Sequence, residues 1–451
     1  MKHNVTFSMG GIHPPQSKHT AHCGIDKADL PKTAVVMLSQ HIGAAARPIV
    51  KPGDKVSRGQ LLAEPASAIS AAVHSPITGT VKSIGATVTI NGYSGDAITI
   101  TATDEQHEAD EQQRRLPPDN SPDASAIASL TATEVIDRIR AAGVVGLGGA
   151  TFPSSPKTSL ARESHTDILI INGCECEPYL TCDDALMQTY PHTIAAGVEI
   201  LRRAIEARHA VIAIEDNKPE AIAAITAAIS KYSEIRVQAL RTKYPQGGEK
   251  QLVEAVSGRC IPSGELPTAV GVVVHNVATA YAVSRAVLDK QPLIERVITI
   301  SNNTGEPRGN YLAAIGTPIA ELPGITPAEG DKVICGGPMM GRAVTSLQAT
   351  VTKGSSGFLV LREARKPQAQ ACIRCSRCVS ACPMGLEPYL LSVYGKQHMA
   401  DEAEAAYVTD CIECGSCSYI CPSHRPLLDY IRLAKGEVKA RQRARNSTSK
   451  K

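Results

Sequence analysis

The chain has 451 residues, of which 43% are hydrophobic, and its formal net charge is +3. This length predicts two to four domains, and the near-neutral charge gives no strong attraction to nucleic acid or to anionic membranes. Aromatic residues make up 3% and tryptophan is absent, which argues against a surface on which bases stack. The sequence has no apolar run of about 18 residues to span a bilayer, and its start lacks the apolar segment of a secretory signal. We therefore expect a cytoplasmic protein, in which the 14 cysteines serve as metal ligands or redox groups.

The first third of the chain predicts an arm, a small β domain and a linker. Residues 1–33 are rich in Gly, His, Pro and Lys and are expected to form an extended arm. Residues 34–103 contain short β-type runs separated by turns, and the phrases "KPGDKVSRGQ" and "VHSPITGTV" resemble the barrel-sandwich hybrid fold of biotinyl and lipoyl carriers. Those carriers hold an acylated lysine at a hairpin tip, where this chain has "SAISAAVHS", so we predict a structural module. Residues 104–129 are polar, acidic and proline-bearing and predict a solvated linker.

The middle of the chain alternates strands and helices, which predicts an α/β core with a mostly parallel sheet over residues 130–293. Its first helix is expected to open with a capping box, Thr131 to Glu134, and to stop at Gly143. Residues 294–365 contain further strands with Gly and Pro turns, which predict a small β-rich domain. Residues 366–435 hold a cysteine cluster among short helices, and residues 436–451 form a basic tail expected to be solvated.

Eight cysteines follow the spacing C-x2-C-x2-C-x3-C-P twice, which is typical of bacterial ferredoxins with two clusters. Three thiolates on a tight loop reach three corners of a cubane, and the fourth cysteine of each run binds the other cluster. We therefore assign one [4Fe–4S] cluster to Cys372, Cys375, Cys378 and Cys421, and the second to Cys411, Cys414, Cys417 and Cys382. The alternative, a pair of structural zinc sites, normally uses two C-x2-C pairs.

A glycine-rich segment, "GVVGLGGATFPSSPK" at residues 143–157, has a composition that suits a backbone wrapped around phosphates. It follows a helix and lacks the Walker spacing, so in isolation a close-packing turn is the simpler interpretation. Three later segments place polar residues at the ends of strands or the starts of helices, where α/β sheets bind ligands. These segments are "INGCECEPYLTCDD", "KYPQGGEKQL" and "VHNVATAYAV", and their candidate residues are Asn172, Glu175, Glu177, Tyr244, Gly247, Gly248, Glu249, Asn276 and Thr279. Each alone is also explained as a cap or turn residue.

Taken together, these segments resemble the NADH- and FMN-binding subunit of respiratory complex I. They are more similar still to the RnfC family of the Rnf complex, a membrane-bound ferredoxin:NAD oxidoreductase, whose N-terminal "GG-HP" arm corresponds to "GGIHPPQSK" here. The resemblance covers nearly the whole chain. It implies a multidomain α/β and β architecture: a barrel-sandwich hybrid, a flavin-binding α/β core, an SLBB β-grasp domain and a ferredoxin-like helical domain with two [4Fe–4S] clusters.

The resemblance also implies roles for single residues. Gly146, Gly148 and Gly149 are expected beneath FMN, and Lys157 at its phosphate. The residues implied to line the flavin and nicotinamide pocket are Asn172, Glu175, Tyr244, Gly247, Glu249, Asn276 and Thr279. The family motif reads closer to "FPTHVK" than to "FPSSPK", and Pro156 is expected to hold Ser155 in extended geometry. Cys174, Cys176 and Cys182 lie beside this pocket, where we expect small buried hydrophobes, with a redox role as the alternative.

The function implied is electron transfer between iron–sulfur clusters and NAD(H) through FMN, in either direction, because flavin handles both single electrons and hydride. The implied partners are the other Rnf membrane and iron–sulfur subunits, with ferredoxin acting indirectly and no nucleic acid. The chain is then a peripheral subunit on the cytoplasmic face of the cell membrane, and ions move through its partners. Two alternatives stay open: a soluble flavin/iron–sulfur reductase of the cobalamin-reductase type, and an electron-transfer adaptor that has lost its flavin.

Overall fold

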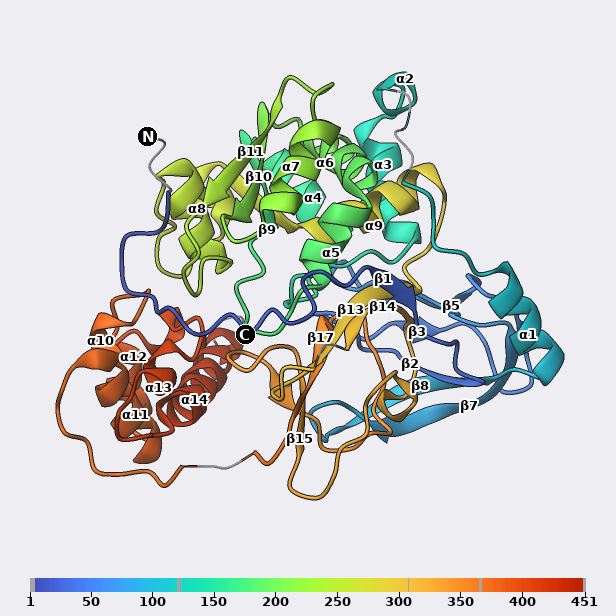
Figure 1. Ribbon diagram of the computed structural model, residues 1–451. Coiled ribbons are helices and arrows are strands. Elements are labelled where there is room, and N and C mark those ends of the chain that lie inside the picture. Colours follow the sequence, from blue (N-terminus) through green and yellow to red (C-terminus); the bar gives the residue numbers. More distant parts are fainter. Residues whose placement is uncertain (1–4, 120–121, 123, 307, 365–366, 449–451) are drawn as a thin grey trace.

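The computed structural model describes residues 5–119, 122, 124–306, 308–364 and 367–448. Figure 1 shows an α/β core at the top, β-sheets below and to the right of it, and a helical C-terminal domain at the lower left. The N-terminal arm runs between the core and the C-terminal domain before it reaches the sheets. None of the helices in the described ranges is both long enough and apolar enough to cross a membrane.

The barrel-sandwich region consists of two antiparallel sheets. One has the order β2 (Thr33–Met37), β8 (Ser94–Thr101), β7 (Gly79–Val88) and β4 (Lys55–Val56), and the other β3 (Arg47–Pro48), β5 (Leu61–Glu64) and β6 (Val73–His74). Alternate side chains of β2 and β8 point inward, as the two-residue period of a strand requires. The inward side chains include Val36, Ile98 and Ile100, which pack with Leu62 and Val73 in one apolar cluster.

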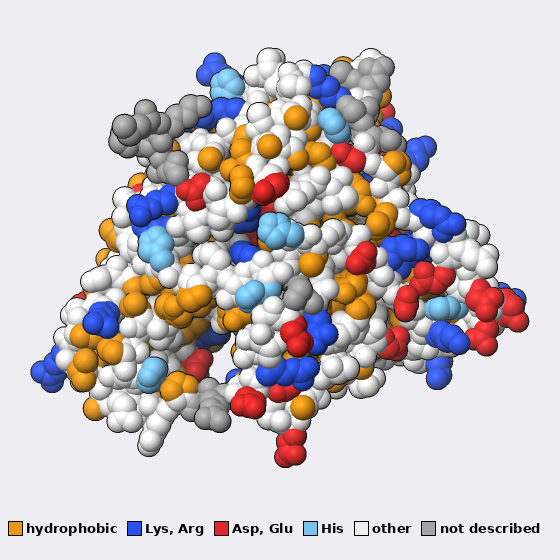
Figure 2. Space-filling view, in the orientation of Figure 1, with side chains coloured by type: hydrophobic (Ala, Val, Ile, Leu, Met, Phe, Trp, Pro, Cys, Tyr) orange, Lys and Arg blue, Asp and Glu red, His pale blue; other side chains and the backbone are white. Residues whose placement is uncertain are grey.

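The prediction of a solvated linker over residues 104–129 is wrong for its first part, which is helix α1 (Asp104–Gln113). Thr103 and Gln106 form a capping box that starts this helix. The buried carboxylate of Asp110 accepts hydrogen bonds from Thr78 N and Oγ1, so α1 is fixed to the β domain. Acidic side chains gather over α1 on the outer face (Figure 2), which explains why the composition alone resembled a linker. A short helix, α2 (Ala124–Ala128), follows, while positions 120–121 and 123 of the expected linker lie outside the described residues.

The α/β core contains the expected parallel sheet, in the order β11 (Ile235–Leu240), β10 (His209–Glu215), β9 (Ile168–Gly173) and β12 (Val272–Asn276). Neighbouring side chains of β9 face opposite ways, so Leu169 and Ile171 join one apolar cluster and Ile170 the other. The first face is covered by α3 (Ala132–Ala141), α4 (Ser154–Glu163), α5 (Cys182–Thr189), α6 (Pro191–Ile205), α7 (Pro219–Ala228) and α9 (Val277–Leu288). Helix α8 (Glu249–Ser257) packs on the second face. The predicted capping box at the start of α3 is confirmed, and Gly143 ends this helix with φ +66°.

Residues after the core form a six-stranded mixed sheet. Its order is β1 (Ile25–Lys27), β14 (Gly309–Ala314), β13 (Glu295–Asn302), β17 (Gly357–Leu361), β15 (Lys332–Cys335) and β16 (Arg342–Ala343). The N-terminal arm supplies the edge strand β1, which pairs in parallel with β14. The arm is therefore not only an extended connection, because its last part completes a sheet built from residues nearly 300 positions away.

The C-terminal domain contains α10 (Arg377–Ser380), α11 (Pro388–Lys396), α12 (Ala400–Ala405), α13 (Ser416–Tyr419) and α14 (Leu427–Thr448). The expectation of a solvated basic tail from residue 436 is wrong for most of that segment, because α14 continues to Thr448. Val438 is fully buried, and Arg441 and Arg445 pair with Asp401 and Glu404 of α12. The last three residues of the expected tail lie outside the described residues.

One buried lysine joins three of these domains. Lys353, which is 1% exposed, donates from Nζ to the carbonyl oxygens of Ala72 and Gly143, both at 2.7 Å. Ala72 belongs to the barrel-sandwich region and Gly143 begins the glycine-rich segment. Burial lowers the pKa of Lys353 to about 7, and a neutral amine satisfies both carbonyls without a buried charge.

This arrangement predicts a pH-dependent stability. The pKa of Lys353 is lower in the folded chain than its ordinary value of 10.5, so the unfolded chain binds more protons between pH 7 and 10.5. The contribution of the neutral Lys353 amine to the free energy of unfolding therefore grows as pH rises above 7 and is lost as pH falls toward 7. Relative to Lys353→Met, the free energy of unfolding of the wild-type chain should increase by up to about 1.4 kcal/mol per pH unit above pH 7. Denaturant unfolding of both chains between pH 6.5 and 8.5 measures the difference, and parallel pH profiles contradict it.

A matched control is Lys32→Met, because Lys32 forms an exposed pair with Asp104 that raises its pKa. Lys32 stays protonated in the folded and unfolded chain over this pH range. Its substitution should therefore shift stability by the same amount at every pH tested.

Candidate functional site

The glycine-rich segment lies at the carboxyl end of β12, against the first turn of α9. Leu147 N donates to Thr279 Oγ1 at 2.9 Å, and a Cβ on Gly148 would lie 3.0 Å from Cβ of Asn276. Gly149 has φ +119° and open space where its Cβ would point. Glycine is therefore required at position 148 because the backbone approaches Asn276 closely, and at position 149 because φ is positive there. It forms a cradle with an open side.

Several of the other predicted pocket residues border this cradle. Asn172 Nδ2 donates to Gly247 O at 2.9 Å, which joins the end of β9 to the glycine turn before α8. Asn276 caps α9 by accepting from Ala278 N. Lys157 Nζ lies 3.4 Å from Glu249 Oε1. The structure thus brings together the N-terminal ends of α4, α8 and α9, each of which favours an anion.

The geometry expected around Pro156 is wrong. Ser155 is helical, because α4 begins at Ser154 and Pro156 lies in its first turn. Proline is tolerated there since the first amides of a helix have no intrahelical acceptor. Lys157 therefore projects from the start of a helix that follows directly after the cradle.

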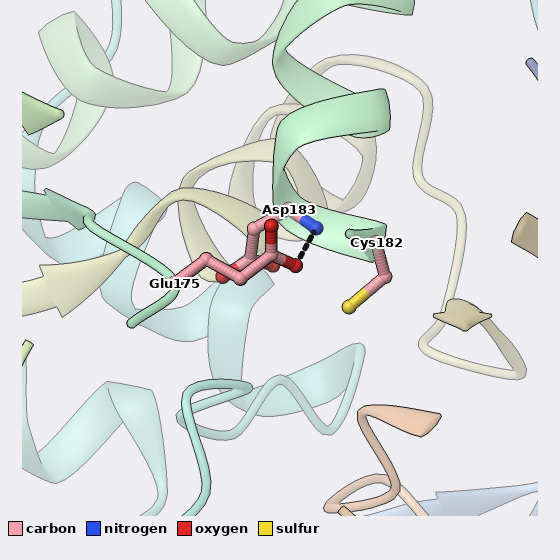
Figure 3. A group of neighbouring side chains, drawn as sticks. All are labelled: Glu175, Cys182 and Asp183. Atoms are coloured by element: carbon pink, nitrogen blue, oxygen red, sulfur yellow. Dashed lines mark hydrogen bonds between the residues drawn. The ribbon is translucent and has the colours of Figure 1, made fainter. Parts of the chain in front are cut away.

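Glu175 and its neighbours form a compact polar group (Figure 3). The Glu175 carboxylate reaches the first turn of α5 and accepts from Asp183 N at 2.8 Å and Asp184 N at 3.2 Å. Cys182 and Asp183 offer ligand atoms within 4.8 Å of it. Burial, with the nearby Glu175 charge, raises the pKa of Cys182 and Asp183. The Glu175 carboxylate already accepts from two amides at the start of α5, so a helix cap accounts for this group.

The thiols predicted beside the pocket are protonated at neutral pH. Burial raises the pKa of Cys174 and Cys182 well above the ordinary value and that of Cys176 to about 12. A reactive cysteine needs a lowered pKa and partial exposure. These environments favour packing over redox chemistry for all three side chains.

Two residues that hold the loop after β9 have roles that the sequence did not predict. Lys18, in the "GGIHPPQSK" arm, donates from Nζ to the carbonyl oxygens of Glu175, Glu177 and Leu180. The Glu177 carboxylate accepts from Met339 N and Met340 N of the six-stranded sheet's loop, at 3.1 and 2.6 Å. Burial raises the pKa of Glu177 to about 7. In the sequence, Lys18 was marked only by its membership of the arm motif.

The two cysteine runs share an unusual backbone. Arg374 and Ser376 in the first run, and Glu413 and Gly415 in the second, have positive φ between 57° and 78° at equivalent positions. Left-handed residues tighten each loop and turn amides toward sulfur, as where Glu413 N donates to Cys411 Sγ at 3.4 Å. The repeated geometry follows the repeated spacing.

The predicted second quartet lies around one cavity lined by Cys382, Cys411, Cys414 and Cys417. Three of these side chains are less than a tenth exposed. The remaining lining is apolar apart from Ser416, and burial together with mutual repulsion raises the pKa of Cys417 to about 12. Such a donor set fits a metal cluster whose binding displaces the thiol protons.

The predicted first quartet lies nearer the surface. Cys372 and Cys375 are exposed, and Cys378 and Cys421 are half-buried. Burial and the nearby Cys421 raise the pKa of Cys378. Gln370 N donates to Ser423 O at 2.9 Å, which holds the start of the first run beside Cys421. The crossed pairing of the two runs is therefore compatible with the fold.

Tyr244 is placed differently from the other predicted pocket residues. Its side chain is 1% exposed, and its hydroxyl donates to Cys414 O at 2.8 Å. Ile12, Ala381 and Cys414 pack with it in an apolar seam. Figure 2 shows hydrophobic side chains at this junction between the core and the C-terminal domain. Tyr244 thus links the glycine turn that follows it to a cysteine loop.

Comparison with known proteins gives this architecture a family. The family models that match are the Nuo51 FMN-binding domain at residues 139–285, the RnfC barrel sandwich hybrid domain at residues 6–106, and a 4Fe-4S dicluster domain at residues 366–422. Component C of the ion-translocating oxidoreductase complex of Rhodobacter capsulatus is 40% identical over 97% of this chain and 84% of its own length. The chain belongs to the RnfC family. The predicted resemblance is confirmed, together with the barrel-sandwich, FMN-binding and iron–sulfur domains, and the zinc alternative is not supported.

Other members show similar coverage. Component C of the proton-translocating ferredoxin:NAD(+) oxidoreductase complex of Clostridium ljungdahlii is 40% identical over 96% of this chain and 94% of its own. Among solved structures, an NAD+-reducing [NiFe]-hydrogenase in the air-oxidized state matches with a TM-score of 0.51 and 19% identity. The match covers 74% of this chain and 71% of the hydrogenase chain, and it shows a shared fold.

The crossed ligation predicts the result of removing one cysteine. Cys382→Ser takes a ligand from the buried quartet but none from the exposed one, so iron content should fall by up to about half. The EPR signal of the exposed cluster should remain. Anaerobic iron analysis and EPR spectra measure both quantities.

Cys260→Ser is the matched control, because Cys260 is exposed and lies outside both runs. It should change neither iron content nor spectra. Equal loss of both clusters in a Cys382→Ser chain that retains its wild-type circular dichroism contradicts the pairing.

Proposed function

We propose that this chain is the peripheral electron-transfer subunit of a membrane-bound Rnf complex, with one FMN, two [4Fe–4S] clusters and NAD(H) as its substrate. The relatives' printed names describe ion-translocating or ferredoxin:NAD(+) oxidoreductase complexes. The single observation that carries the proposal is the seam at Tyr244. It joins the edge of the flavin cradle to the loop of the buried cysteine quartet within one chain.

The cradle residues suit a flavin phosphate. Gly149 has open space where a Cβ would point, so a ligand can approach the backbone there, and the N-termini of α4 and α9 supply partial positive charge. Lys157 would neutralise the phosphate, and Glu175, held by amide donors, would border the pocket. When bound, flavin exchanges single electrons with clusters and electron pairs with nicotinamides.

Exposure of the two quartets supports an order of electron transfer. The quartet at Cys372 and Cys375 reaches the surface, whereas the quartet at Cys414 lies against the core. A partner protein would exchange electrons with the exposed cluster, and the buried cluster would connect it to the flavin pocket. The mostly apolar lining of the inner quartet would limit the access of water to its cluster.

The remaining parts of the proposal concern assembly. The six-stranded sheet after residue 294 would be a β-grasp domain of the SLBB type, consistent with its mixed strand order. The chain would dock from the cytoplasmic side on the membrane and iron–sulfur subunits of the complex. Ferredoxin would reach it only through those partners, and the partners would move the coupling ion.

Reconstitution tests this function. The wild-type chain, refolded anaerobically with iron, sulfide and FMN, should retain one FMN and about eight irons. NADH should then bleach the flavin absorbance. Lys157→Ala removes the cation expected at the phosphate, so it should weaken FMN retention at least about tenfold, as loss of a charge-assisted contact would.

Lys439→Ala is the control, because Lys439 is an exposed lysine of α14 far along the chain from the cradle. It should bind FMN as the wild type does. Full iron content with no FMN uptake would instead identify an electron-transfer adaptor. Reduction of a corrinoid by NADH without membrane partners would identify a cobalamin reductase.

A further inference from the structure

A second cavity lies behind the glycine cradle, where the barrel-sandwich domain, the segment after α1, helix α9 and strand β13 meet. Its volume is about 280 Å³, close to the lower end of small-molecule sites. Residues of the cavity wall come from segments as distant as Arg58 and Leu312. The cavity is separate from both cysteine quartets and from the predicted contacts of the flavin.

The charge of this cavity is strongly unbalanced. Its wall contains five arginines and one carboxylate, Glu295. Glu295 is already shared by Arg58 and Arg114, each bonded to a different carboxylate oxygen. The other three arginines are Arg115, Arg285 and Arg296.

These three guanidinium groups lack a buried carboxylate of their own. Arg115 is exposed, donates to Arg114 O, and has no carboxylate partner among the described residues. Arg285 pairs with Asp289, the residue directly after α9, whose side chain is 47% exposed. Arg296 is buried and donates only to backbone carbonyls, including that of Leu147. Such an excess of positive charge in a cavity attracts an anion.

Apart from Gln113 and Gln291, the rest of the wall is apolar or aromatic. Leu116, Tyr281, Leu293 and Leu312 contribute to it, and no described residue hydrogen-bonds to the Tyr281 hydroxyl. Guanidinium groups match phosphate oxygens in pairs, and the apolar wall suits a ring or chain attached to that phosphate. We infer that this cavity binds an organic phosphate of nucleotide size.

The position of the cavity connects it to the cradle. Leu147 lines the cavity and lies between Gly146 and Gly148, and Arg296 donates to its carbonyl oxygen at 3.4 Å. Ala278, in the first turn of α9, also lines it. A ligand here contacts the back of the elements that form the cradle. Any coupling between this ligand and flavin binding rests on the proposed function, whereas binding of the organic phosphate to the cavity does not.

The test uses ADP as the probe and the full-length chain. Isothermal titration should show one ADP bound to the wild type in the presence of saturating NADH. Arg115→Gln and Arg285→Gln should each weaken ADP binding at least about tenfold, because each removes a charge-assisted phosphate contact. Arg441→Gln, which alters an exposed pair in α14, should bind ADP as the wild type does.

Two results overturn the inference. One is no ADP binding at millimolar concentration by a chain with wild-type circular dichroism. The other is ADP binding that NADH displaces and that neither arginine substitution weakens, which assigns the nucleotide to the nicotinamide pocket. Loss of FMN uptake with arginine-dependent ADP binding intact would refute the proposed flavin function and leave this site standing.

Discussion

The hydrogen bond from Tyr244 to the carbonyl of Cys414 is the contact on which the rest of the arrangement depends. The glycine turn after Tyr244 borders the cradle, and Cys414 belongs to the buried quartet. Electron transfer between two centres falls steeply with their separation, so their spacing must not fluctuate. A buried tyrosine in an apolar seam fixes that spacing, because any sliding of the domains would leave its hydroxyl and a carbonyl unsatisfied in a dry environment.

The polar loop after β9, whose Cys176 packs against the seam, is held by hydrogen bonds from several sides. Lys18 gathers three of its carbonyl oxygens, and Lys218 Nζ donates to a fourth, that of Cys174, at 2.7 Å. Burial lowers the pKa of Lys18. Burial also opposes the charge of Lys218, but Glu215 beside it raises the pKa overall. Buried cations with many acceptors thus replace the regular hydrogen bonds that an irregular loop lacks.

Local sequence patterns predicted many of the helices and strands well. The capping box at Thr131, the parallel strands and the twofold C-x2-C-x2-C-x3-C-P spacing each depend on interactions within a few residues or on one repeated motif. The failures have a common cause. Helix α1 and the end of α14 are polar in composition, but Asp110 and Val438 are buried against distant elements. The contact of Tyr244 with Cys414 was not predicted for the same reason, because the two residues lie 170 positions apart and nothing near Tyr244 in sequence indicates it.

Pro156 shows how a small difference in backbone geometry determines the chemistry of the cradle. An extended Ser155 would carry Lys157 away from the glycines, whereas a helical Ser155 places Lys157 in the first turn of α4. At this position the positive charge of Lys157 lies beside the partial positive charge of the helix N-terminus, so both can act on the same anion. Its present partner, Glu249, is 45% exposed, and an exposed ion pair of this kind contributes little to stability. An anionic group that enters the cradle therefore competes for Lys157 against a weakly bound partner. Pro156 lacks an N–H, but at this position the helix has no intrahelical acceptor for one, so no hydrogen bond is lost.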